Sequence, residues 1–448
     1  ASDPGGARLQ VRRAASRVFS TVSVQLPTPP SPNDDPVRVL IIGAGAAGLA
    51  TAIFAARAAP DLEVRCLDGA SKIGAKILVS GGSRCNVTNR IVTERDFWGG
   101  SQRVVRHVLR AFPADRAAAF FEALGVPLHE EEDGKLFPDT NRSRTVLDAL
   151  LAEARRLNVS IEAGRRVQSV SREQDGFVVE TADGESHNAG VVVLATGGRS
   201  LPKTGSDGFG YELGRKLGHG YVDTTPALAP LVLEGDRHAA LSGVSHDALL
   251  TLRVDGTIAT RLEGALLWTH FGVSGPVALN MSRHWHRARL SGQTADVRLS
   301  LCPGETFESL EDWLLSQERA RPKALVSTVL ATRIPASLAD AWIVASGIDQ
   351  GTTMAHLAKD DRRRLLHALL DTPLPVADSR GYAYAEVTSG GIPLDEIEPA
   401  TMQSRVCPGL FLVGEILDVD GRLGGFNFQW AWSSGWIAGH AIAKAARA

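Results

Sequence analysis

The segment VRVLIIGAGAAGLATAIFAAR, residues 37–57, carries the strongest structural signal in the chain. Residues 39–42 form a short continuous apolar run, which is typical of a parallel strand buried on both faces. Residues 43–48 match the pattern G-x-G-x-x-G, and residues 49–57 have the composition of a helix. The segment therefore predicts a strand, a glycine turn and a helix of the kind that binds a dinucleotide.

Each glycine of this turn has its own physical reason. Gly43 allows the tight turn, Gly45 lets the backbone approach a pyrophosphate, and Gly48 lets the helix pack closely on the strand. The helix N-terminus then offers free N–H groups and a positive dipole end to the phosphates. A second predicted strand, LEVRCLD, ends in Asp68. Its carboxylate can accept hydrogen bonds from an adenosine ribose and would repel a 2′-phosphate, which favours FAD or NAD over NADP.

Three further segments favour FAD over NAD. The stretch SKIGAKILVSGGSRCNVTN (71–89) places a second glycine cluster where NAD dehydrogenases normally have a plain helix and strand. The stretch GVVVLATGG (190–198) is a buried strand that ends in an A-T-G turn, a turn that recurs in two-dinucleotide-binding flavoproteins. A third buried strand, 410–413, ends in Gly414-Glu415, as in the element that holds a flavin ribityl chain.

With these segments the chain resembles the BaiN/RdsA family of NAD(P)/FAD-dependent oxidoreductases, which includes proteins named aminoacetone oxidases. The resemblance covers residues 37 to 440 in the order of the family. It departs from the family at Asp68, where Glu is usual, and at Ser83, where a third Gly is usual. The matching segments are IIGAGAAGLA, KILVSGGSRCNVTN, DGKLFPDT, VVLATGGRSLPKTGSDGFGYELGRKLGH, PALAPLV, THFGVSGPVAL, AEVTSGGIPLDEI and LFLVGEILDVDGRLGGFNFQWAWSSGWIAG.

The resemblance implies an α/β fold whose Rossmann-like FAD domain is built from two sequence segments. It places Gly414-Glu415 beside the ribityl chain, Gly424-Gly425 at the pyrimidine end of the isoalloxazine, and Asn427-Phe428 at the start of the last helix. The FAD-binding positions expected are Gly43, Gly45, Ala46, Ala47, Gly48, Asp68, Lys76, Gly81, Gly82, Arg84, Cys85, Asn86, Val167, Ala195, Thr196, Gly197, Gly414, Glu415, Gly424, Gly425, Asn427 and Phe428.

The catalytic residues are not assigned by these patterns, and Arg84 and Glu386 are only weak candidates. Arg84 could hold a carboxylate or carbonyl oxygen because its charge is permanent and its donors are forked. Glu386 could relay a proton or cap a strand. Cys85 has no CxxC partner and no adjacent base, so packing against the flavin is the better interpretation. Asn86, Thr388 and Ser389 are further candidates for the face of the flavin.

The predicted domain boundaries lie where the spacing of apolar residues along the sequence changes. Residues 37–226 form the first segment of the FAD domain, and residues 373–448 form the second. Residues 227–304 alternate apolar and polar side chains, which predicts an inserted β-barrel or sandwich. Residues 305–372 have a helical period and predict a helical subdomain. Residues 1–36 are Arg-rich, contain Ser, and have no acid between residues 4 and 33, so they are either a transit peptide or a disordered extension.

Composition narrows the classes of function and location. The 448 residues carry a net charge of −2, which gives no electrostatic footprint for nucleic acid. No apolar run approaches the ~20 residues of a membrane span. The four cysteines are scattered without a CxxC pair, so no metal site is expected, and a reducing compartment is favoured. The expected location is therefore intracellular: cytoplasmic, or organellar if the N-terminus is a transit peptide. The oligomeric state stays open.

Three functions remain open. The leading prediction is NAD(P)H-dependent reduction of an activated C=C bond in a hydrophobic, carbonyl-bearing small molecule, as the resemblance implies. The second is an amine oxidase that passes electrons to oxygen. The third is a flavoprotein that modifies RNA, which the charge balance disfavours. NAD(P)H would act as a transient electron donor, because the only phosphate-binding glycine fingerprint in the chain is assigned to FAD.

Overall fold

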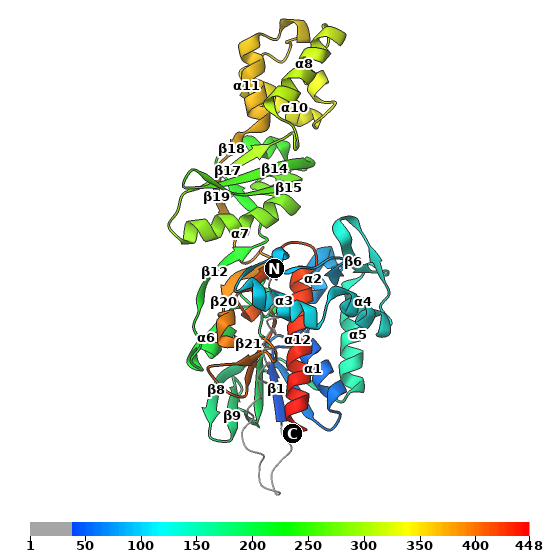
Figure 1. Cartoon of the computed structure of the whole chain (residues 1–448), viewed down its shortest axis with the longest axis vertical. Helices are drawn as coiled ribbons and strands as arrows, with labels where there is room; N and C mark the ends of the chain where they lie inside the picture. Colours follow the sequence, from blue (N-terminus) through cyan, green and yellow to red (C-terminus); the bar gives the residue numbers. More distant parts are fainter. Residues whose placement is uncertain (1–37, 448) are drawn as a thin grey trace, which may run out of the picture.

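The computed structural model describes residues 38–447, which form three parts arranged end to end (Figure 1). A Rossmann-type domain lies at one end, a small β-barrel in the middle, and a helical subdomain at the far end. The predicted α/β fold with an inserted barrel and an inserted helical part is confirmed. The expected transit-like extension, residues 1–36, lies outside the described residues.

The Rossmann domain is organised around a seven-stranded sheet with the order β21-β22-β23-β11-β1-β2-β7. The five strands from β23 to β7 run parallel, and β22 and β21 run antiparallel at one edge. Their bounds are β1 (Arg38–Ile42), β2 (Glu63–Asp68), β7 (Ser160–Ala163), β11 (Val191–Leu194), β21 (Ile397–Glu398), β22 (Gln403–Ser404) and β23 (Leu410–Leu412).

The centre of this sheet is apolar and covered by protein on both faces. Residues 39–41 of β1 and 192–194 of β11 have no exposed surface, as expected for parallel strands with helices on both sides. The helices of this domain are α1 (Ala46–Ala58), α2 (Ala75–Ser83), α3 (Gln102–Ala111), α4 (Ala114–Ala123), α5 (Ser143–Arg156), α6 (Phe209–Lys216) and α12 (Phe426–Ala445).

Short antiparallel ladders complete the domain. One is a meander of three strands. In another, residues 88–89 pair with residues 135–138, which pair in turn with residues 128–130, and a third joins residues 97–99 to 419–421. These strands are β8 (Val167–Glu173), β9 (Gly176–Thr181) and β10 (Ser186–Ala189); β3 (Thr88–Asn89), β5 (Leu128–Glu130) and β6 (Lys135–Pro138); and β4 (Phe97–Gly99) with β24 (Val419–Gly421).

The insert begins with an antiparallel sheet of order β18-β17-β14-β15-β16-β13-β19. Its edge strands β18 and β19 are separated only by Pro375, so one continuous segment pairs with both ends and closes a barrel. The chain thus returns to the Rossmann sheet only after Ser379, past the boundary expected at residue 373. The elements are β13 (Leu231–Leu233), β14 (Ser245–Val254), β15 (Thr257–Thr269), β16 (Gly272–Ser274), α7 (Pro276–Leu290), β17 (Ala295–Ser300), β18 (Thr372–Leu374) and β19 (Val376–Ser379).

The helical subdomain packs on the barrel through its own apolar faces. Its helices are α8 (Phe307–Ala320), α9 (Val326–Leu330), α10 (Ala336–Ala345) and α11 (Lys359–Leu370). Leu310 and Leu365 are fully buried and belong to the same cluster as Leu250 and Leu299 of the barrel. The barrel and the helices therefore share one hydrophobic core, separate from that of the Rossmann domain.

Two features join the insert to the Rossmann domain. Strands β12 (Val222–Ala227) and β20 (Val387–Gly391) pair antiparallel, so the chain leaves and returns side by side. Helix α7 adds a buried ion pair, in which Arg283 donates from Nε to Asp420 Oδ2 at 2.6 Å and from Nη2 to Asp420 Oδ1 at 3.0 Å. Both side chains are buried, so this bidentate pair fixes the barrel on the domain below it.

Helices α1 and α12 approach each other closely beside the sheet (Figure 1). A Cβ atom at Gly439 would lie 2.8 Å from both Ala55 N and Thr51 O, which are backbone atoms of α1. The tryptophans of α12 secure the other side: Trp432 Nε1 donates to Val87 O at 2.9 Å, and Trp430 Nε1 donates to Gly414 O at 3.1 Å. Their role is therefore structural.

We expect the substitution Gly439→Ala to destabilise the protein despite the better helix propensity of alanine. The new methyl group meets backbone atoms that cannot move independently, and overpacking of this kind costs about 1–3 kcal/mol. Denaturant unfolding measures the change. The control Lys444→Ala, at the exposed end of the same helix, should stay within about 0.5 kcal/mol of the unmodified protein. A stabilisation of about 1 kcal/mol in Gly439→Ala would mean that propensity outweighs the contact.

Candidate functional site

A cavity of about 470 Å³ opens where the parallel strands of the Rossmann sheet end. Its wall is formed by the residues that directly follow β1, β2, β11 and β23, together with α2 and the first turn of α12. The carboxyl ends of parallel strands form the usual ligand crevice of such sheets. The cavity is long and reaches from Asp68 to Leu228, at the foot of the insert.

The first glycine turn has the geometry that its sequence predicts. Gly43 has a φ of +104°, and a Cβ there would lie 2.4 Å from Ala195 O. A Cβ at Gly48 would lie 1.9 Å from Gly43 O, so this glycine lets α1 meet the turn. A Cβ at Gly45 would meet nothing within 4 Å, and Gly45 lines the cavity. Of the three glycines, Gly45 is therefore the one beside which the cavity leaves free space for a ligand.

Asp68 stands at the end of β2 and is held in place by two backbone donors. Ala44 N donates to Oδ2 at 2.7 Å, and Ala70 N donates to Oδ1 at 2.8 Å. Each carboxylate oxygen has a further lone pair, and the side chain lines the cavity. Asp68 can thus bind ribose hydroxyls while it ties the glycine turn to β2.

The second glycine cluster forms a wall of left-handed backbone. Gly81, Gly82, Ser83 and Cys85 all have a positive φ, between 54° and 67°. A Cβ at Gly82 would meet nothing within 4 Å, whereas the thiol of Cys85 is fully buried. Burial raises the pKa of this thiol to about 12, so Cys85 stays neutral and is no thiolate nucleophile.

The first turn of α12 completes the far end of the cavity. Gly425 must lack a side chain, because a Cβ would lie 2.6 Å from Thr88 O and 2.8 Å from Asn86 Oδ1. Asn86 lines the cavity, and its Oδ1 has no hydrogen-bond partner within residues 38–447. Such an orphaned buried oxygen indicates a donor on a bound ligand. The open glycines, this oxygen and the helix N-terminus together fit FAD.

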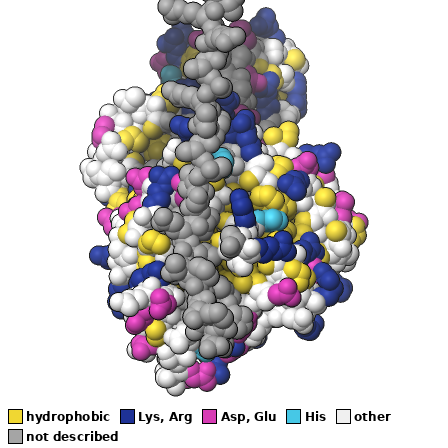
Figure 2. Space-filling view, turned by 60° about the horizontal axis from the view of Figure 1, so that its bottom comes forward, with side chains coloured by type: hydrophobic (Ala, Val, Ile, Leu, Met, Phe, Trp, Pro, Cys, Tyr) yellow, Lys and Arg dark blue, Asp and Glu magenta, His cyan; other side chains and the backbone are white. Residues whose placement is uncertain are grey.

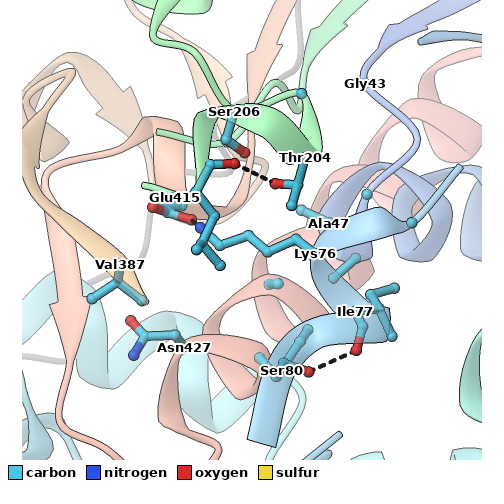
Figure 3. A pocket seen from close by; sticks show the side chains of 18 of the residues that line it. Gly43, Ala47, Lys76, Ile77, Ser80, Thr204, Ser206, Val387, Glu415 and Asn427 are labelled. Carbon is cyan, nitrogen blue, oxygen red and sulfur yellow. Dashed lines mark hydrogen bonds and ion pairs between the residues drawn. The ribbon is translucent and has the colours of Figure 1, made fainter. Parts of the chain in front are cut away.

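A hydrogen-bonded network crosses the middle of the cavity wall. Lys76 Nζ donates to Glu415 Oε2 and to Ser200 Oγ, at 2.5 Å each. Glu415 Oε1 accepts from Ser200 Oγ at 2.8 Å and from Thr388 N at 2.9 Å. Figure 3 shows Lys76 and Glu415 pointing toward each other, with Val387 and Asn427 across the cavity. The network joins α2 to the ends of β11, β20 and β23, and so fixes the shape of the site.

The structure brings most of the expected FAD-binding residues to this cavity, but places three behind its wall. Gly48, Cys85 and Gly414 do not line it. Gly414 donates its N–H to Ser434 Oγ at 3.1 Å, and so packs against α12. Thr388 and Ser389 are likewise buried behind the wall. The expected residues that do line the cavity are Gly43, Gly45, Ala46, Ala47, Asp68, Lys76, Gly81, Gly82, Arg84, Asn86, Val167, Ala195, Thr196, Gly197, Glu386, Glu415, Gly424, Gly425, Asn427 and Phe428.

Several lining residues were not expected from the sequence. Arg165 and Arg166 follow the end of β7, the strand next to β2, after Gly164, so the same strand-end rule would have found them. Arg166 donates to Asp207 at 2.5 Å and lies 4.9 Å from the ring centroid of Phe209. Lys135, Phe137 and Arg422 come from antiparallel ladders, where no such rule applies.

The two candidate catalytic residues lie on different walls of the cavity. Arg84 donates to Glu131 at 2.6 Å, and its guanidinium lies 4.1 Å from the ring centroid of Phe137. Glu386 stands beside Leu228, to whose carbonyl it donates its backbone N–H at 3.2 Å. Burial raises the pKa of the Glu386 carboxyl, and the charge of Lys76 lowers it by less.

Comparison with known proteins identifies the family. The sequence family described as HI0933-like protein Rossmann domain matches residues 37–441. The chain therefore belongs to the HI0933-like family of FAD-binding Rossmann proteins and is an FAD-dependent oxidoreductase. Of the helices within residues 38–447, none has the length and apolar character needed to cross a membrane.

Two relatives match over nearly their whole length. The 3-dehydro-bile acid delta(4,6)-reductase of Clostridium scindens is 33% identical over 407 residues, which cover 91% of this chain and 99% of the relative. The ribosomal RNA dihydrouridine synthase of Escherichia coli is 32% identical over 400 residues, covering 89% and 96%. Among solved structures, E. coli quinol fumarate reductase FrdA is 18% identical with a TM-score of 0.45, covering 92% of this chain and 71% of that one.

We expect the substitution Asp68→Ala to weaken FAD binding about tenfold to a hundredfold. The change removes acceptors for the ribose, where a hydrogen bond to a charged group contributes about 1.5–3 kcal/mol, and it also releases Ala44 N. Titration of the apoprotein with FAD measures the dissociation constant. Asp68→Asn keeps one acceptor and should lose less. An unchanged dissociation constant in Asp68→Ala would show that the adenosine ribose binds elsewhere.

Proposed function

From membership of this family, we propose that the protein reduces a C=C bond conjugated to a carbonyl group in a hydrophobic small molecule, with NAD(P)H as the electron donor. One observation carries the proposal: the cavity wall presents a carboxyl group, Glu386, beside Leu228 and without a hydrogen-bond partner for its carboxyl within residues 38–447. The relative named as a delta(4,6)-reductase supports the same class of reaction.

Glu386 has the properties of a proton donor. Burial raises the pKa of this carboxyl, which favours the protonated form that general acid catalysis requires. Leu228 and Val387 lie beside it on the cavity wall, and both are buried. Apolar residues of this kind fit a hydrophobic substrate.

The residues divide the chemistry between them. Bound FAD, once reduced, supplies a hydride from N5. With the hydride taken up at the β carbon of the substrate, Glu386 would give the proton that the α carbon needs. Arg84 has donors beyond the one that it uses for Glu131, and these can hold the carbonyl oxygen. Glu386 then regains its proton from solvent, so the substrate gains one hydride and one proton.

A second candidate substrate is a pyrimidine ring in RNA, whose C=C bond is also conjugated to a carbonyl. A groove of about 940 Å³ runs beside α3, and residues 101–111 contain no acid. Arg103 and Arg110 have no carboxylate partner in the described part of the chain. The opposite wall carries Asp395 and Glu398, which weakens the positive field. The groove is further lined by the cations Arg106 and Arg405 and by the imidazole of His107.

This second candidate departs from the expectation that nucleic acid is no partner, which rests on the net charge of −2. The relative named as a ribosomal RNA dihydrouridine synthase supports it. On the face shown in Figure 2, Lys and Arg side chains are interspersed with Asp and Glu, without a broad basic surface. We therefore rank the small-molecule substrate first. Reoxidation of the photoreduced enzyme by a conjugated dienone, compared with a uridine-containing RNA, distinguishes the two.

We expect Glu386→Gln to slow reoxidation of the reduced flavin by a conjugated enone by about 10²–10⁴-fold, because the proton donor is lost. In the unmodified enzyme the acid form donates, so the rate should be highest below the raised pKa of Glu386 and fall as the pH rises through it. Glu386→Gln should lose this dependence. Anaerobic stopped-flow absorbance at each pH measures both effects.

The control for this experiment is Glu263→Gln, which changes an exposed glutamate of the barrel and should leave the rate unchanged. Flavin reduction by dithionite should be equal in all three proteins. Equal enone rates in Glu386→Gln and the unmodified enzyme would contradict the assignment. If amines reduce the flavin and nicotinamide nucleotides do not, the amine oxidase alternative replaces the reductase.

A further inference from the structure

An arginine between two aromatic rings forms a column beside the cavity. The guanidinium carbon of Arg380 lies 3.4 Å from the ring centroid of Tyr384 and 4.6 Å from that of Phe271. Tyr384 is nevertheless 51% exposed, so part of its ring surface faces solvent. A ring held from behind by a cation offers a preorganised surface on which a flat ligand can stack.

Backbone hydrogen bonds place this column at the rim of the cavity. Arg380 N donates to Pro230 O at 3.0 Å, and Glu386 N donates to Leu228 O at 3.2 Å. On the other side, Leu201 N donates to Tyr382 O at 2.8 Å. Leu201, Leu228 and Glu386 all line the cavity. The segment 380–386 is therefore held between two stretches of the cavity wall.

The rim also carries positive charge that no described carboxylate neutralises. Within residues 38–447, neither Arg380 nor Lys203 forms an ion pair. Lys203 is exposed and lies two residues from Leu201. We call Phe271, Arg380, Tyr384 and Lys203 the rim shelf. An open aromatic face beside unpaired cations is the chemistry that recognises an aromatic base joined to phosphate.

We propose that the rim shelf binds the adenosine and phosphate part of the reduced nicotinamide dinucleotide. This inference rests on the electron donor of the proposed function. The chain has a single G-x-G-x-x-G fingerprint, which serves FAD, so the donor needs another contact for its adenine and phosphates. A ligand stacked on Tyr384 and held by Arg380 lies at the rim, from which its nicotinamide can enter beside Leu228 and Glu386.

The test uses the full-length holoenzyme and 1,4,5,6-tetrahydro-NADH and -NADPH, which bind without reacting. Calorimetric titration gives the dissociation constant of each. We expect Tyr384→Ala to raise it about tenfold, because stacking of one base on an aromatic ring is lost. Tyr384→Phe keeps the ring and should restore binding. Arg380→Gln should weaken binding and reduce its dependence on salt.

The matched control is Arg172→Gln, which removes another arginine that lies over a ring, that of Phe177, on the β8–β9 ladder. Its dissociation constant should equal that of the unmodified protein. As a second readout, flavin reduction by NADH and NADPH should require higher donor concentrations in Tyr384→Ala, with the limiting rate unchanged. Reoxidation of the photoreduced variant by an enone should also be unchanged.

Of the five results below, four would overturn the inference, and the third would overturn only the proposed reaction. Equal dissociation constants in Tyr384→Ala and the unmodified enzyme would place the donor elsewhere. If neither nucleotide binds the unmodified enzyme, but its photoreduced form still reduces an enone, the inference fails and the proposed reaction stands. Failure of enone reduction with normal, Tyr384-dependent nucleotide binding would instead overturn only the proposed reaction. Tyr384-dependent binding of a single-stranded RNA oligonucleotide, without an effect on the dinucleotides, would assign the shelf to nucleic acid. A loss of binding in Arg172→Gln as large as in Arg380→Gln would show that net charge alone is responsible.

Discussion

Glycines at a few points of close backbone contact determine the geometry of the whole Rossmann domain. Gly43 lies against the carbonyl of Ala195, and Gly48 lies against the carbonyl of Gly43, so α1 begins directly at the edge of the sheet. On the far side of α1, Gly435 and Gly439 let α12 approach its backbone. The sheet, α1 and α12 therefore pack so closely that a residue with a side chain would not fit at these glycine positions. The crevice at the strand ends exists because these contacts hold its walls.

The cavity at the strand ends contains two electrostatic environments. Near the middle, Lys76, Glu415 and Ser200 satisfy one another, so their charges and dipoles are fixed. At the insert end, Glu386 has apolar neighbours and no such partner within the described residues. Burying a carboxylate without a partner costs more free energy than burying the neutral acid, so burial raises the pKa of Glu386. Glu415 thus has a structural role in the cavity wall, whereas the carboxyl of Glu386 makes no hydrogen bond to the described residues.

Sequence patterns predicted the parts of the site that depend on local backbone chemistry. The glycine turn at residue 43, the acid at residue 68 and the start of the last helix can be read from short segments, because turns and strand ends have compositional signatures. The lysine–glutamate pair joins positions 76 and 415, and the pairing of such distant residues has no local signature. For the β part of the insert, the sequence pattern predicted either a barrel or a sandwich. Its closure depends on one segment, 372–379, that pairs with both edges, and a period-two pattern cannot reveal this.

The pairing of β12 with β20 has a consequence for how the chain folds. Everything between residues 227 and 387 is inserted at one point of the Rossmann domain, whose sheet obtains β23 only from residues beyond the insert. During synthesis, β1 and α1 emerge first but lack α12, which covers α1 and bears the last wall of the crevice. The apolar surface that α12 later covers stays open while the barrel and the helical part assemble with their own core. Contacts between residues almost 400 positions apart then close the domain, which makes late folding slow and exposes the nascent chain to aggregation.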